Sequence, residues 1–150
     1  MSPMLGKHLI IELHGVDSEL LNDIERLKKI LIESAITAGA TIIGQVFHKF
    51  SPHGVTGIIA VKESHLSIHT WPEFNYAALD IFTCRGIDPN IALEVIIEKM
   101  KPKYYFTMNI QRGEPYTEEV VYDESEAPNK DIIEHSIVPA IEDKNLGNPL

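Results

Sequence analysis

Cysteine is almost absent from this chain: Cys84 is the single one among 150 residues. One cysteine excludes a disulfide within the chain, and a reducing compartment is the simplest interpretation. The first residues lack the basic start and apolar stretch of a secretory signal. No run reaches the roughly 18 consecutive apolar residues that a membrane span requires. We therefore expect a cytoplasmic protein with no membrane partner.

Positive charge is also scarce. Lys and Arg total 13 against 22 Asp and Glu, which gives a formal net charge of -9. Nucleic-acid binding needs clustered Lys and Arg to neutralise phosphates, so we expect no nucleic-acid partner. A small-molecule substrate fits better, and the acidic balance favours a cationic one. The 44% of apolar residues is typical of a globular domain with a packed core.

Short β-prone runs and two amphipathic segments predict an α+β domain over residues 1–112. Caps and apolar spacing predict one continuous helix from Asp17 to Ala38 and another from Asp88 to Met100. The strands are expected at residues 8–14, 41–50, 55–62, 66–71, 76–84 and 103–111. Residues 113–150 are acidic and turn-prone, and we expect them to form a partly disordered arm.

The order of these elements is nearly a palindrome about the Glu63–Ser64 bond. Both helices should cover one face of a largely antiparallel sheet, which gives a two-layer sandwich. The opposite face of the sheet would then be bare. We therefore expect a homodimer in which two sheets face each other in a four-layer αββα arrangement.

The segment from Glu63 to Glu73 concentrates three hydroxyls, two imidazoles and two carboxylates. His65, His69 and Glu73 recur every four residues, as metal ligands on a helix do. The β-branched residues and the proline of this segment favour a strand instead, so we predict no metal site. Ser64 is either an ordinary hydrogen-bonded serine or a nucleophile that attacks its own backbone.

The run from Glu63 to Glu73, with Phe47 to Gly57 before it and Tyr76 to Cys84 after it, resembles the prokaryotic S-adenosylmethionine decarboxylase family. The resemblance covers roughly residues 5 to 113. It implies a proenzyme that cleaves itself between Glu63 and Ser64 and converts Ser64 into a covalent pyruvoyl group. The mature protein would consist of residues 1–63 and 64–150. Decarboxylation leaves a carbanion, and such a carbonyl cofactor serves as its electron sink.

The resemblance also assigns roles to individual residues. His69 would take a proton during self-processing, and Cys84 would return a proton to the α-carbon of the product. Glu73 corresponds to a carboxylate that binds a ribose, and Phe50 to an aromatic near the adenine or sulfonium group. Thr56 stands where a serine that assists processing is common, and its hydroxyl offers the same donor and acceptor.

The implied activity is decarboxylation of S-adenosylmethionine, which supplies the aminopropyl donor for spermidine. One departure from the family pattern is Arg85, which stands directly after Cys84 where glycine is usual. The extra cation could alter the substrate preference. Two alternatives share the motif: an arginine decarboxylase on the same scaffold that makes agmatine, and an unprocessed nucleoside-binding or regulatory paralogue.

Overall fold

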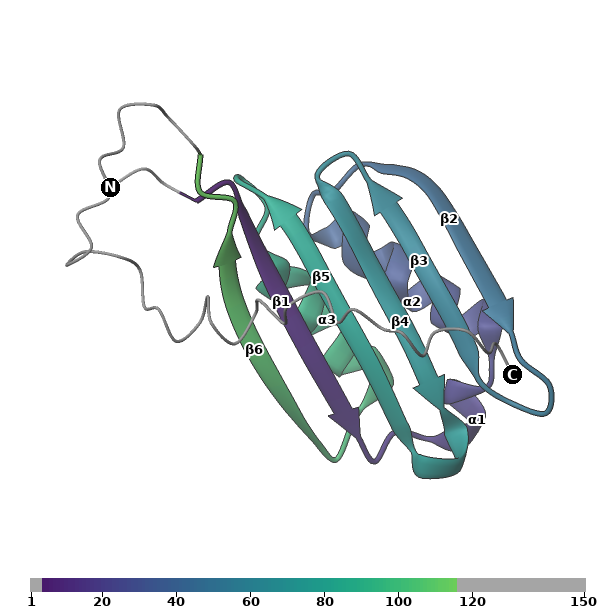
Figure 1. Cartoon of the computed structure of the whole chain (residues 1–150). Coiled ribbons are helices and arrows are strands. Elements are labelled where there is room, and N and C mark those ends of the chain that lie inside the picture. The colour runs from purple at the N-terminus through teal and green to yellow at the C-terminus, as the bar shows by residue number, and fades with distance from the viewer. Residues whose placement is uncertain (1–3, 116–150) are drawn as a thin grey trace, which may run out of the picture. The chain divides into compact units, whose positions relative to one another are not determined.

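Six strands form one antiparallel sheet in the computed structural model, which describes residues 4–115 (Figure 1). The sheet order is β2-β3-β4-β5-β1-β6. The elements are β1 (Gly6–His14), α1 (Ser18–Leu21), α2 (Ile24–Thr37), β2 (Ile42–Lys49), β3 (Val55–Val61), β4 (Ser64–Trp71), the short 3-10 helix η1 (Pro72–Phe74), β5 (Tyr76–Cys84), α3 (Pro89–Met100) and β6 (Tyr104–Arg112). The predicted α+β class is confirmed, and the six predicted strands are all present.

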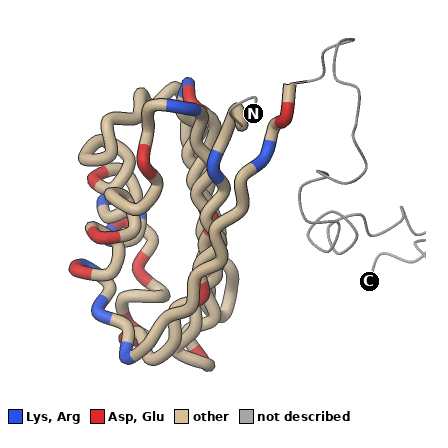
Figure 2. Tube along the Cα trace, turned by 90° about the vertical axis from the view of Figure 1, so that its left-hand side faces the viewer, with Lys and Arg blue, Asp and Glu red and all other residues tan. Residues whose placement is uncertain are grey.

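The helices α2 and α3 cover one face of the sheet, as Figure 2 shows edge-on. The strands alternate, so that Leu9, Ile11 and Leu13 of β1 are buried against this helix layer. Leu27 and Ile96 bring the apolar sides of α2 and α3 into the same core. None of the described elements covers the opposite face, which we call the outer face.

The predicted continuous helix over residues 17–38 is wrong, because the segment forms two helices. Asp17 caps α1 by accepting a hydrogen bond from the amide of Glu19 at 3.0 Å. Asp23 then caps α2 by accepting from the amide of Arg26 at 3.1 Å. The side chain of Asn22 accepts from the amide of Gly54 at 3.0 Å. Short polar side chains compete in this way for backbone groups, and they end α1 although the apolar spacing continues.

The edge strand β6 directs its apolar side chains to the outer face. Met108 pairs with Ile10, and Phe106 with Glu12, so each pair lies on the face opposite the buried residues of β1. The exposed fractions are 60% for Met108 and 62% for Phe106. An apolar row of this kind on an uncovered face is typical of a surface that binds a partner.

Two further expectations concern the acidic arm and membrane-spanning helices. Of the predicted arm at residues 113–150, only 113–115 belong to the described part, and the remainder lies outside it. Within residues 4–115, no helix has the length and the apolar character needed to cross a membrane.

Candidate active site

The Glu63–Ser64 bond lies in the tight turn between β3 and β4. Val61 pairs with Ser64, so Lys62 and Glu63 form the loop of a hairpin. Ser64 has a φ of 146°, a conformation that residues other than glycine rarely adopt. Backbone strain of this kind costs roughly 1–3 kcal/mol. The strained residue is therefore the serine that follows the predicted cleavage point.

Both polar ends of Glu63 are held by backbone amides. The amide of Cys84 donates a hydrogen bond to the carbonyl oxygen of Glu63 at 2.9 Å. The amide of Thr41 donates to the side-chain carboxylate of Glu63 at 3.0 Å, and this bond lowers the pKa of Glu63. A donor directed at a carbonyl oxygen can stabilise the negative charge that develops there when a nucleophile attacks the carbon.

The hydroxyl of Ser64 lies beside a polar cluster on the outer face. Its Oγ is 3.4 Å from Nδ1 of His65, and Nε2 of His65 lies 2.8 Å from Oδ2 of Asp80. The same carboxylate oxygen is 2.7 Å from Nε2 of His8. Ser67 donates its hydroxyl proton to the other oxygen of Asp80. Three strands therefore contribute to one hydrogen-bonded group next to Ser64.

This polar cluster is also the one set within residues 4–115 whose His, Asp, Glu or Cys atoms converge closely enough to bind a metal. Nδ1 of His8, however, lies 3.2 Å from the guanidinium of Arg112, which can only donate. Nε2 of His8 therefore carries the ring proton and donates it to Asp80. The cluster is occupied by hydrogen bonds, and it is not the set that the sequence spacing suggested.

Cys84 ends β5 at the same end of the sheet as Ser64. Its thiol is free and exposed. It borders a cleft of about 270 Å³, and Lys7 and Arg85 also line this cleft. Arg85 is held against the chain before β1, because its Nε donates to the carbonyl of Met4 at 3.2 Å. Cations thus lie close to the predicted proton donor.

His69 lies far from Ser64 within one chain. Both residues belong to β4, and five positions at about 3.3 Å each separate them by roughly 16 Å. The β3–β4 register pairs His69 with Thr56, and Oγ1 of Thr56 is 3.0 Å from Nδ1 of His69. The sequence-predicted processing residues therefore contact each other but not the serine.

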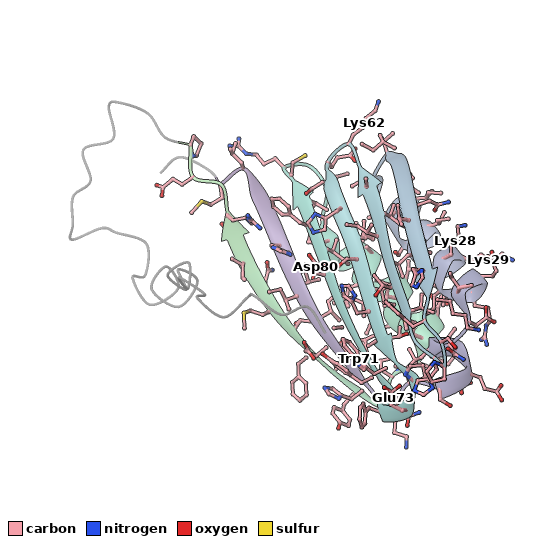
Figure 3. The ribbon with its side chains drawn as sticks, turned by 45° about the vertical axis from the view of Figure 1, so that its right-hand side comes forward. Lys28, Lys29, Lys62, Trp71, Glu73 and Asp80 are labelled. Carbon is pink, nitrogen blue, oxygen red and sulfur yellow. The ribbon has the colours of Figure 1, made fainter. Side chains whose placement is uncertain are left out.

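The predicted substrate-binding residues also lie at the His69 end. Glu73 in η1 forms an ion pair with His53 at 3.0 Å. The exposed Phe50 precedes this histidine in the loop between β2 and β3. Figure 3 shows Glu73 at one end of the sheet and Lys62, next to the cleavage point, at the other, with Asp80 between them.

Comparison with known proteins places this arrangement in a family. The sequence pattern of S-adenosylmethionine decarboxylase matches residues 7–113. The chain belongs to the S-adenosylmethionine decarboxylase family. The S-adenosylmethionine decarboxylase proenzyme of Caldicellulosiruptor saccharolyticus is 50% identical over 110 residues, which is 73% of this chain and 89% of that protein. The S-adenosylmethionine decarboxylase proenzyme of Pelotomaculum thermopropionicum is 44% identical over 120 residues, which is 77% of this chain and 95% of that protein.

A solved structure agrees with this family assignment. The crystal structure of the adenosylmethionine decarboxylase from Aquifex aeolicus matches with a TM-score of 0.72 and 33% sequence identity. The match covers 77% of this chain and 97% of that one. The sequence-based resemblance to the S-adenosylmethionine decarboxylase family is therefore confirmed, whereas the roles of the individual site residues stay predictions.

Sequence reasoning missed the partners of His65. His8 and Asp80 lie on β1 and β5, and only the register of these strands brings them beside His65. One signal was available: His8, His65 and Asp80 each occupy a polar position within an alternating strand pattern. The side chain of His65 thus connects the Asp80 carboxylate with the hydroxyl of Ser64.

Proposed function

We propose that this chain is an S-adenosylmethionine decarboxylase that cleaves itself between Glu63 and Ser64 and uses a pyruvoyl group made from Ser64. The observation that carries the proposal is the hydrogen bond from the amide of Cys84 to the carbonyl of Glu63, beside a strained serine. Family membership supplies the reaction class. The geometry supports the idea that this particular peptide bond is the one that breaks.

Self-cleavage would begin when Oγ of Ser64 attacks the carbonyl carbon of Glu63. The Cys84 amide stabilises the resulting oxyanion, and rupture of the C–N bond leaves an ester with a free amine on Ser64. Removal of the α-proton of Ser64 then expels the Glu63 carboxylate. Water replaces the nitrogen, which leaves as ammonia, and the new chain begins with a carbonyl-containing residue.

The residues fit a pyruvoyl group because the Cys84 amide donates to the carbonyl of Glu63, directly before the serine from which the group forms, and the exposed Cys84 thiol belongs to the same residue. The group supplies a carbonyl that condenses with the substrate amine and accepts the electrons of the departing carboxylate. The thiol of Cys84 holds the proton that returns to the α-carbon. Glu73 and Phe50 present a carboxylate and an aromatic ring that suit the ribose and the adenine or sulfonium group.

The roughly 16 Å that separates Ser64 from His69 along β4 supports a site shared between two chains. Ser64 and Cys84 lie at one end of the outer face, and His69, Thr56 and Glu73 at the other. A two-fold axis between two stacked sheets, running across the strands, would place one end over the other. The apolar row on β6 supplies a surface for this contact. We therefore assign the enzyme a homodimer of cleaved protomers with two shared active sites.

The substrate is tested by measuring carbon dioxide release from S-adenosylmethionine and from arginine with one preparation. We expect release from S-adenosylmethionine, which yields the aminopropyl donor for spermidine. Release from arginine alone would overturn the substrate assignment and would make Arg85 the first candidate for the changed substrate preference. The exposed free thiol of Cys84 supports a reducing compartment, and we assign the enzyme to the cytoplasm.

A further inference from the structure

We propose that His65, held in place by Asp80, is the base that removes the proton from the Ser64 hydroxyl in the first step of self-cleavage. The proposal rests on the proposed function, because it concerns the same peptide bond. It assigns a separate catalytic step to a histidine that lies beside the serine in the same chain. His69 then acts only in the later removal of the α-proton.

The positions of the reacting atoms support this role. Nδ1 of His65 is 3.4 Å from Oγ of Ser64, and no other histidine nitrogen of the described residues forms a hydrogen bond with that oxygen. Neighbouring strand residues ordinarily point to opposite faces. The unusual φ of Ser64 accompanies the approach of its hydroxyl to the next side chain. Contacts of this length commonly shorten when the reaction begins.

The tautomer of His65 follows from its partners. Burial raises the pKa of Asp80, but hydrogen bonds from Ser67, His65 and His8 together lower it below its ordinary value. An ionised carboxylate only accepts, so Nε2 of His65 carries the ring proton and donates it at 2.8 Å. In the neutral ring Nδ1 then has a free lone pair, and this atom lies 3.4 Å from Oγ of Ser64. Asp80 therefore acts as a positioning residue that fixes the tautomer.

His8 strengthens this arrangement from the neighbouring strand. Its Nε2 donates to the same oxygen of Asp80, and its Nδ1 accepts from Arg112 at 3.2 Å. The guanidinium of Arg112 also lies 4.5 Å from the ring centre of Phe82. The groups that face Asp80 are therefore one hydroxyl and two imidazoles, all of them donors. With each donor in place, the carboxylate keeps its charge next to His65.

The step balances without any other reactant. The Oγ proton of Ser64 passes to Nδ1 of His65 as the bond from Oγ to the carbonyl carbon of Glu63 forms. The carbonyl electrons move onto the oxygen that the Cys84 amide holds. When the C–N bond breaks, the imidazolium of His65 returns the proton to the departing nitrogen. The products are an ester, a free amine and a neutral histidine.

The test follows cleavage of freshly translated chains over time by mass spectrometry, with hydroxylamine added to parallel samples to break any ester. His65→Ala should slow cleavage by about 100-fold or more, the size of a lost acid–base group. No hydroxylamine-sensitive ester should accumulate, and added imidazole should restore part of the rate. His69→Ala is the matched control, and it should accumulate the ester.

The outcomes separate this proposal from the previous one. If His65→Ala cleaves at the wild-type rate, or accumulates the ester, the assignment of His65 is wrong while self-cleavage stands. A slowed His65→Ala chain that imidazole leaves unchanged would show a structural role and would also overturn it. His65→Gln keeps a donor for Asp80 and is therefore the control for misfolding. This variant should cleave as slowly as His65→Ala. A wild-type chain that never cleaves would overturn both proposals.

Discussion

The backbone amide of Cys84 donates a hydrogen bond to the carbonyl oxygen of Glu63 at 2.9 Å, so the last residue of β5 contacts the turn between β3 and β4. The backbone amide and the thiol of Cys84 can therefore have separate roles. The amide faces the bond that we expect to break, whereas the thiol is exposed at the end of β5. The same residue can therefore serve self-cleavage through its backbone and decarboxylation through its side chain.

Replacement of the thiol tests this separation. Cys84→Ala keeps the backbone amide, so cleavage at Glu63 should proceed at close to the wild-type rate. Decarboxylation should fall by about 100-fold or more, because a positioned proton donor contributes that much. Mass spectrometry follows the first reaction and carbon dioxide release the second. Loss of cleavage in Cys84→Ala would show that the thiol itself takes part in processing.

A shared active site predicts complementation between inactive variants. Cys84→Ala and Glu73→Ala alter opposite ends of the outer face and should each be inactive as homodimers. In a co-expressed heterodimer, one site carries both substitutions and the other carries neither, so activity should return in half of the sites. Co-expression of Cys84→Ala with Ser64→Ala is the matched control. Both of these residues lie at one end, and no recovery is expected.

The outer face should carry the dimer contact. Phe106→Glu places a charge in the apolar row of β6, and light scattering should then detect a monomer. Ile36→Glu on α2 is the control, because Ile36 is 61% exposed against 62% for Phe106. This control chain should remain a dimer. A dimer that survives Phe106→Glu and dissociates with Ile36→Glu would put the contact on the helix side.

Asp80 predicts a pH-dependent contribution to stability. Burial raises the pKa of Asp80, but hydrogen bonds from Ser67, His65 and His8 together lower it by more, so the net pKa is below the ordinary value. The folded state therefore favours the ionised carboxylate. A lowered folded-state pKa gives stability that is present above the ordinary carboxyl pKa and is lost as the pH falls through the folded value. Asp80→Asn should therefore be less stable at neutral pH and approach the parent below about pH 4.

The measurement is chemical denaturation of the uncleaved Ser64→Ala chain with and without Asp80→Asn, at one protein concentration. We expect a difference of roughly 1–3 kcal/mol in the free energy of unfolding at neutral pH, the range for hydrogen bonds to a partly buried charge. A difference that stays constant down to about pH 3 would show that the carboxylate charge is not what stabilises the cluster.

Local sequence patterns were sufficient to predict most of the fold. Alternation of polar and apolar residues identified β4 and β6, and the Asp88 cap with its following proline identified α3. The break between α1 and α2 was not predicted, because Leu20 and Ile24 keep the apolar spacing on both sides of it. The polar pair Asn22 and Asp23 was the missed signal.

The candidate site was harder to predict because it depends on register. The contact of Ser67 and His65 with Asp80 requires the turn over Pro72–Phe74 to end at Asn75, whose left-handed backbone sets the pairing of β4 with β5. The sequence resemblance also treats Ser64 and His69 as members of one site. On a strand, five residues separate them by about 16 Å, and this distance favours a site in which His69 comes from a second chain.

The mass of the purified protein tests the central claim most directly. We expect two fragments, residues 1–63 and 64–150, and the second should be lighter by one ammonia than a chain that begins with an intact Ser64. Ser64→Ala should give a single chain of 16.9 kDa. A wild-type protein that remains one intact chain of this mass would contradict self-cleavage, and with it the assignment of Ser64 as the source of the pyruvoyl group.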